Sequence, residues 1–126
     1  MAPFDAPTLL HNPRCTKSRA AKALLDERGI AYKERRYLDE PLTPAELDTL
    51  RRRLGRPARE WVRTSEDAFK EAGLGGQPKD NLKDEVILAA MARFPSLIER
   101  PILILDDRAV VGRPPDRVIR LLDDEL

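Results

Sequence analysis

The sequence has few reactive and few aromatic residues, and each shortage excludes a class of protein. Its 126 residues include a single cysteine, so no disulfide can form within the chain and a disulfide-stapled secreted fold is excluded. Aromatic residues make up 5%, and 23 basic against 22 acidic residues leave a net charge of +1. Surfaces that bind nucleic acid need an excess of positive charge, and those that stack bases need aromatic rings. We therefore expect no nucleic-acid partner.

Long apolar runs are also lacking. No stretch is long enough for a transmembrane helix, and the N-terminus does not show the basic and then apolar pattern of a secretory signal. The last four residues resemble an endoplasmic-reticulum retention tail, but without a secretory signal we expect the end of an acidic helix there. The length fits a single domain, 1–126. The expectation is a cytoplasmic protein with no membrane partner.

The first forty residues predict a strand, a loop, a helix and a second strand. Residues 8–11 fit a short buried strand, and residues 30–38 alternate as a second strand. Between them, apolar residues recur at helical spacing up to Gly29, which suits the C-terminal cap of a helix. This order is a βαβ unit.

The pattern of residues 43–94 is mostly helical. Thr43 is the expected cap of one helix, with Pro44 at its first position and Glu46 completing a capping box. Asn81 is the expected cap of a later helix, which Pro95 ends.

The remaining residues predict two strands and a helix. Residues 100–105 read as a buried strand and residues 110–112 as its partner, and the short turn between them requires an antiparallel pair. A final helix follows, with proline in its first turn. The predicted fold class is therefore α/β: a short mixed sheet with flanking helices and a helical insertion at about 43–94.

The only cysteine and the only histidine lie four residues apart, in the loop before the first helix. There, unpaired backbone N–H groups and the helix dipole lower the pKa of a thiol such as that of Cys15. Free cysteines are more often small buried hydrophobes, but the polar and basic neighbours on both sides favour a reactive thiolate. Positive charge near this thiol is expected from His11, Arg14, Lys17 and Arg19.

Residue counts and spacings exclude several other uses of this cysteine. One cysteine and one histidine are too few for a metal site, and a cysteine protease would need its histidine on another segment. Position 18 is serine, which excludes a Cys-x-x-Cys motif. Position 21 is alanine, where a phosphatase loop would need arginine. No bound cofactor and no metal are expected.

The stretch HNPRCTKSR resembles the active-site loop of the glutaredoxin-coupled arsenate reductases, whose pattern is His-Asn-Pro-x-Cys-x-x-Ser-Arg. The resemblance runs from residue 9 to about 122 and includes the sequences YL at 37–38 and ERPIL at 99–103. It implies a thioredoxin-like fold that carries a helical insertion, in agreement with the predicted order of elements. It also implies that Cys15 is the catalytic nucleophile, supported by His11, Asn12, Ser18 and Arg19.

In that family, three arginines hold the oxyanion, and by position they fall on Arg63, Arg100 and Arg113. The last two directly precede proline at a strand border, where the backbone is held extended and a guanidinium can offer a bidentate fork. The resemblance further implies that the peptide bond before Pro101 is cis. The arginines at 51–53, by contrast, are expected on a wet helix face.

The activity implied by the resemblance is the reduction of arsenate to arsenite by the Cys15 thiolate. Because the chain has no second cysteine, glutathione is the implied co-substrate and glutaredoxin the implied partner. Two alternatives remain open. One is a glutathione-dependent thiol oxidoreductase of the same family that acts on another substrate. The other is an Spx-like transcription regulator without enzymatic activity, although Ser18 interrupts the Cys-x-x-Cys motif typical of those proteins.

Overall fold

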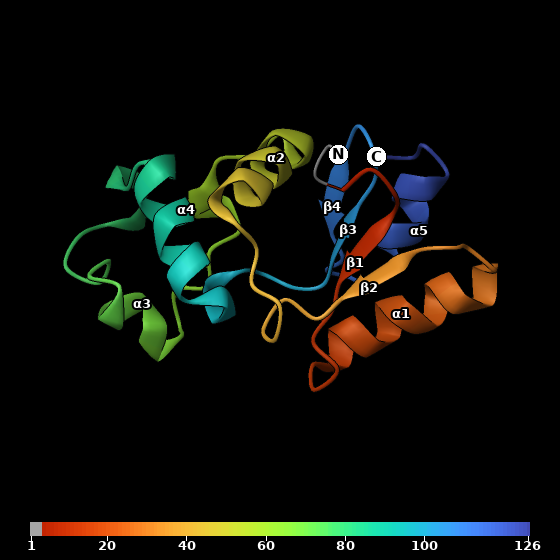
Figure 1. Cartoon of the computed structure of the whole chain (residues 1–126), viewed down its shortest axis with the longest axis horizontal. Coiled ribbons are helices and arrows are strands. Elements are labelled where there is room, and N and C mark those ends of the chain that lie inside the picture. The colour runs from red at the N-terminus through yellow and green to blue at the C-terminus, as the bar shows by residue number, and fades with distance from the viewer. Residues whose placement is uncertain (1–3) are drawn as a thin grey trace.

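A four-stranded mixed sheet forms the centre of the molecule, in a computed structural model that describes residues 4–126 (Figure 1). The strands are β1 (Thr8–Leu10), β2 (Lys33–Arg35), β3 (Ile102–Ile104) and β4 (Ala109–Val111). Their order across the sheet is β2-β1-β3-β4. Strand β1 is parallel to β2 and antiparallel to β3, and β3 is antiparallel to β4. This confirms the predicted α/β class and the antiparallel pair near the C-terminus.

Helices cover both faces of this sheet. Helix α1 (Thr16–Arg28) follows β1, and α5 (Arg117–Leu122) follows β4. Between β2 and β3 lie α2 (Pro44–Leu54), α3 (Asp67–Glu71) and α4 (Asp84–Arg93), joined by the short 3-10 turns Ala58–Glu60, Lys79–Asn81 and Pro95–Leu97. Within residues 4–126, none of the helices has the length and apolar character needed to cross a membrane.

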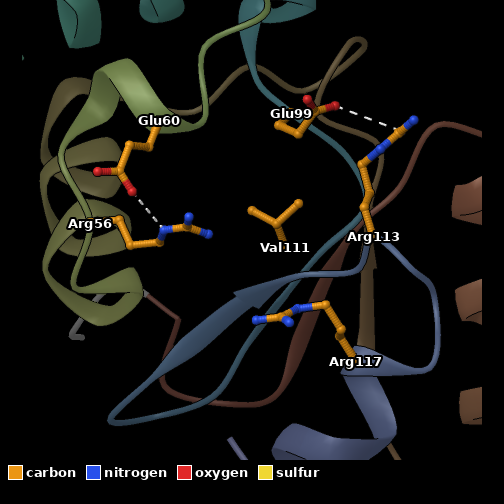
Figure 2. Close-up of a pocket in the computed structure, with 6 residues that line it drawn as sticks. All are labelled: Arg56, Glu60, Glu99, Val111, Arg113 and Arg117. Atoms are coloured by element: carbon orange, nitrogen blue, oxygen red, sulfur yellow. Dashed lines mark hydrogen bonds and ion pairs between the residues drawn. The ribbon is translucent and has the colours of Figure 1, made fainter. Parts of the chain in front are cut away.

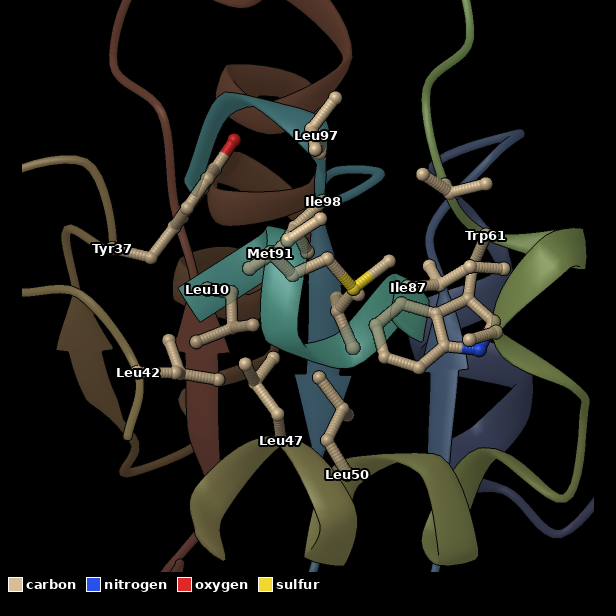
Figure 3. Close-up of a cluster of buried hydrophobic side chains, with 14 of the residues drawn as sticks. Leu10, Tyr37, Leu42, Leu47, Leu50, Trp61, Ile87, Met91, Leu97 and Ile98 are labelled. Atoms are coloured by element: carbon tan, nitrogen blue, oxygen red, sulfur yellow. The ribbon is translucent and has the colours of Figure 1, made fainter. Parts of the chain in front are cut away.

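The alternation of side chains along the strands divides the core into two clusters on opposite faces. On one face, strand residues pack against α1 and α5; this cluster includes Leu9, Leu103, Val110, Ala21, Leu25, Val118 and Leu121. On the other face, the larger cluster joins the sheet to α2 and α4 and includes Leu10, Ile102, Ile104, Leu47, Leu50, Ile87 and Met91 (Figure 3). Because both faces are covered, β1 and β3 are buried along their full length.

The helix ends follow the predicted local chemistry at two places. The Thr43 hydroxyl accepts the Glu46 backbone N–H at 3.1 Å, and the Glu46 carboxylate accepts the Thr43 N–H at 2.9 Å, which completes the capping box of α2. Gly29 ends α1 with a φ of 72°, a left-handed conformation that favours glycine.

Several predicted boundaries are wrong. The strand predicted over 30–38 is reduced to Lys33–Arg35, because this edge strand pairs only with β1 and that ladder is three residues long. Asn81 does not cap α4; it ends a 3-10 turn, and α4 starts at Asp84 without a side-chain cap. The last helix ends at Leu122, so the acidic residues that follow it are not helical. Its prolines lie in the preceding turn, where the Pro114 carbonyl accepts the Arg117 N–H.

The expectation of a wet helix face at 51–53 is also wrong for Arg53. Its Nη1 atom donates hydrogen bonds to the backbone carbonyls of Phe4 and Leu105, both at 2.9 Å. The side chain therefore ties α2 to the N-terminal segment and to the end of β3. Its neighbour Arg52 is exposed and pairs with Asp48, one turn earlier on the same helix.

Replacing Arg53 by alanine should lower the free energy of unfolding by about 2 kcal/mol, because two charge-assisted hydrogen bonds to partly buried carbonyls are lost. The matched change Arg52→Ala should cost less than about 0.5 kcal/mol, since an exposed ion pair contributes little. Urea denaturation of both variants measures the difference. Equal losses of stability would contradict the assigned role of Arg53.

Candidate active site

Cys15 stands at the N-terminal cap of α1, at the end of a tight loop. The side-chain oxygen of Asn12 accepts the Arg14 N–H at 3.0 Å, and its backbone carbonyl accepts the Cys15 N–H at 3.0 Å. These bonds turn the chain so that Cys15, in an extended conformation (φ −95°, ψ 124°), leads directly into the helix. Its thiol is partly exposed. The Arg19 guanidinium closes the loop from outside by donating to the Pro13 carbonyl at 2.9 Å.

The surroundings of the sulfur favour its ionised form. Burial by itself raises the pKa of the Cys15 thiol, but the backbone amides of Ser18 and Lys17 and the guanidinium of Arg100 outweigh that effect. The net result is a pKa below the ordinary value of a thiol. The helix N-terminus and one arginine thus supply the positive environment that activates a cysteine.

His11 does not contribute the positive charge expected of it. Its side chain is buried, and burial is the main cause that lowers its pKa, against the opposing effect of Glu34. At neutral pH the ring is therefore uncharged. Its Nε2 faces the Glu34 carboxylate at 3.6 Å, and its Nδ1 lies 2.7 Å from the Ser18 hydroxyl. Because a carboxylate only accepts, we assign the ring proton to Nε2 and the role of acceptor to Nδ1.

Ser18 joins the histidine to the cysteine loop. Its hydroxyl oxygen accepts the Asn12 N–H at 3.0 Å while the hydroxyl proton is directed to His11. Ser18 is fully buried. His11, Asn12 and Ser18 therefore act together to shape the loop, and none of them needs to carry a charge.

Strand register brings Arg100 to this loop. In the antiparallel pair of β1 and β3, Leu10 lies opposite Ile102, so the residues that follow β1 meet those that precede β3. The peptide bond between Arg100 and Pro101 is cis in the structure, as the resemblance implied.

The other two arginines lie beside the segment 99–100. An isolated bridge pairs Val62 with Ile98, and the Arg63 Nη1 atom is 3.7 Å from the Glu99 carboxylate. Arg113 follows β4; its Nη1 donates to the Arg100 carbonyl at 3.1 Å and lies 3.7 Å from the same carboxylate. The structure thus gathers all three arginines, and Arg100 is among the main groups that lower the pKa of the Cys15 thiol.

Gly112 allows β4 to approach the proline closely. A Cβ atom at this position would lie 2.9 Å from Cγ of Pro101, which is closer than side chains tolerate. The Gly112 N–H donates to the Pro101 carbonyl at 2.8 Å. A glycine here therefore lets Arg113 reach the Arg100 backbone.

Sequence reasoning gave no role to two residues of this region. Glu99 carries the carboxylate between Arg63 and Arg113, and its only signal was its place immediately before Arg100. Tyr37 is buried, and burial raises the pKa of its hydroxyl, with smaller effects from Arg100, Cys15 and Glu99. Its phenol therefore stays protonated beside the site. Figure 3 shows its hydroxyl end pointing away from Leu42 and Leu47.

A pocket of about 510 Å³ lies beside Glu99 and Arg113 (Figure 2). Its lining residues are Arg56, Glu60, Glu99, Val111, Arg113 and Arg117. Within the described part of the chain, no group of three or more histidine, cysteine or carboxylate side chains is placed to hold a metal ion.

We predict that alkylation of Cys15 by iodoacetamide will follow an apparent pKa below the value of about 8.5 for a free cysteine. Arg100→Ala should raise that pKa, because the guanidinium stabilises the thiolate and its loss favours the neutral thiol. Arg14→Ala, which removes an exposed cation from the same loop, is the control and should change the value little. Alkylation rates between pH 5 and 10 provide the measurement, and an unchanged pKa in Arg100→Ala would contradict the assignment.

The chain is similar in sequence and in structure to known proteins of one family. The family model described as ArsC matches residues 10–121. A Neisseria meningitidis protein named arsenate reductase is 44% identical over 115 residues, which are 90% of this chain and 96% of that protein. The solved structure of an arsenate reductase from Vibrio cholerae is 40% identical, covers 90% of this chain and 95% of its own, and superposes with a TM-score of 0.82. The global transcriptional regulator Spx of Listeria innocua is 32% identical, over 91% of this chain and 86% of the regulator.

These similarities show that the chain belongs to the ArsC family and has the thioredoxin-like fold of its structural relatives.

Proposed function

We propose that this protein reduces arsenate to arsenite, with Cys15 as nucleophile and with glutathione and glutaredoxin as the source of electrons. The observation that carries the proposal is the lowered pKa of the Cys15 thiol beside Arg100, with Arg63 and Arg113 gathered within reach of the same segment. A thiolate next to guanidinium groups suits attack on a tetrahedral oxyanion, because the cations offset the charge of the anion that the thiolate must approach.

The first step forms a bond between sulfur and arsenic. The Cys15 thiolate attacks the arsenic of bound arsenate, one As–O bond breaks, and the departing oxygen leaves as water after taking up protons. Arg100 stands beside the sulfur and is placed to bind an oxygen of the anion as it approaches. Amide groups at the start of α1 can bind a further oxygen.

The second and third steps transfer the electrons. A glutathione thiolate attacks the Cys15 sulfur, so that an S–S bond forms and the S–As bond breaks. The electron pair of that bond stays on arsenic, which leaves as arsenite. Because the chain has no second thiol, the mixed disulfide is then cleared by a glutaredoxin thiolate that attacks the glutathione sulfur and frees Cys15. This chemistry needs a reducing compartment, and we place the protein in the cytoplasm.

The test is a coupled assay with purified protein, arsenate, glutathione and glutaredoxin, in which glutathione reductase reports NADPH consumption. Turnover should require both glutathione and glutaredoxin, and Cys15→Ser should abolish it while the protein remains folded by circular dichroism. Turnover of a different substrate in the absence of arsenate reduction would indicate a related glutathione-dependent oxidoreductase. A chain that shows neither activity would fit the regulator alternative.

Arg100 and Arg113 should contribute to the turnover of arsenate, whereas an exposed arginine on α2 should not. Arg100→Ala or Arg113→Ala should lower kcat/KM for arsenate by about 2–4 kcal/mol of transition-state stabilisation, the range for losing one preorganised charged donor. Lysine at either position should restore part of this loss, since it keeps the charge without the planar fork. Arg52→Ala serves as the control. Parent-like kinetics in both alanine variants would rule out the oxyanion site.

Carboxylates oppose part of the positive charge of these arginines. The structure places the carboxylates of Glu66 and Glu99 beside Arg63, at 3.2 and 3.7 Å, and Glu99 beside Arg113 as well. The cluster is therefore partly neutralised before any anion arrives.

A further inference from the structure

One carboxylate oxygen contacts all three members of the arginine cluster, which consists of Arg63, Arg100 and Arg113. Oε1 of Glu99 lies 3.7 Å from Nη1 of Arg63 and 3.7 Å from Nη1 of Arg113. The same oxygen accepts the backbone N–H of Arg100 at 3.3 Å. A negatively charged oxygen of this chain thus contacts all three residues that the proposed function assigns to the oxyanion.

The pairing with Glu99 offsets charge but leaves donors of Arg63 without a hydrogen bond. Distances of 3.7 Å exceed those of a good N–H···O hydrogen bond, which lie near 2.7–3.2 Å. Accordingly, Nε and Nη1 of Arg63 are buried but have no hydrogen-bond partner among residues 4–126, although Nε also lies 3.2 Å from a Glu66 oxygen. A planar carboxylate with one oxygen in the cluster leaves these donors available. A tetrahedral oxyanion offers more oxygens and more charge.

The Glu99 side chain also has open space into which it can rotate. The Glu99 side chain is 28% exposed and, like Arg113, lines the pocket of about 510 Å³ shown in Figure 2. The pocket is also lined by Arg117 and by the ion pair of Arg56 with Glu60. A rotation of Glu99 away from the cluster would therefore turn its charge toward solvent and toward a pocket with two further guanidinium groups, one of which already pairs with a carboxylate.

From these contacts we infer that Glu99 is an internal counter-anion, which a tetrahedral oxyanion must displace from Arg63 and Arg113 before the site binds it. The inference rests on the proposed function, in that these arginines bind the substrate. Glu99 is then a residue that sets affinity. It offsets part of the positive charge of the empty site and weakens the binding of every anion by the free energy needed to displace it.

The test uses inorganic sulfate, a tetrahedral dianion that the protein cannot reduce. Sulfate bound beside Cys15 should slow alkylation by iodoacetamide, so the concentration that halves the rate reports its affinity at constant ionic strength. In Glu99→Gln that concentration should fall at least fivefold, because the amide keeps the shape of the side chain and removes the competing charge. Glu99→Ala should shift the value in the same direction.

Glu60→Gln is the matched control. It removes an equal charge from the same pocket, but Glu60 pairs with Arg56 and not with the cluster. Its half-protecting concentration should stay within twofold of the parent. Each rate is compared with the rate of the same variant without sulfate, so that a change in thiol reactivity does not count as a change in affinity.

Two results would overturn the inference. If Glu99→Gln needs as much sulfate as the parent or more, Glu99 holds the arginines in place and does not compete for them. If sulfate protects neither protein, the cluster does not bind tetrahedral anions. The protection by sulfate is measured without any turnover. An absence of arsenate reduction would therefore reject the proposed function, while the sulfate titration would still decide the role of Glu99.

Discussion

The antiparallel register between β1 and β3 is the constraint on which the site depends. Because Leu10 lies opposite Ile102, the loop that carries Cys15 must run beside the residues just before β3. A shift by one residue would turn every side chain of β3 to the opposite face and separate the core clusters from their helices. Burial of both faces of β1 and β3 therefore holds Arg100 next to the sulfur.

Two shorter contacts between distant segments bring the other two arginines to the same place. The bridge between Val62 and Ile98 places Arg63 beside Glu99, and the close contact of Gly112 with Pro101 places Arg113 beside the Arg100 carbonyl. Residues from three distant parts of the chain thus meet around segment 99–101. The result is a thiolate environment in which cations are close, but in which Glu99 and Glu66 already oppose part of their charge.

Burial and the neighbouring charged and polar groups together set the protonation state of the groups near the cysteine. The buried ring of His11 is neutral, so it organises the loop through Ser18 and does not stabilise the thiolate by charge. Tyr37 is buried and keeps its proton. Cys15, which is partly exposed and faces amides and Arg100, is the group whose ionised form is favoured. Positive charge at the site therefore comes from arginine and from the helix N-terminus.

The sequence by itself determined the features that depend on neighbours along the chain. The capping box at Thr43, the left-handed Gly29 and the place of Cys15 before α1 are all local, and the short apolar runs within 8–11 and 100–105 indicated buried strands. Only the tertiary structure decided what depends on contacts between distant segments. It ended β2 at Arg35, neutralised His11 by burial, bound Arg53 to two backbone carbonyls and set Glu99 among the arginines. A residue's charge and exposure depend on which partner reaches it through space, and no local pattern carries that information.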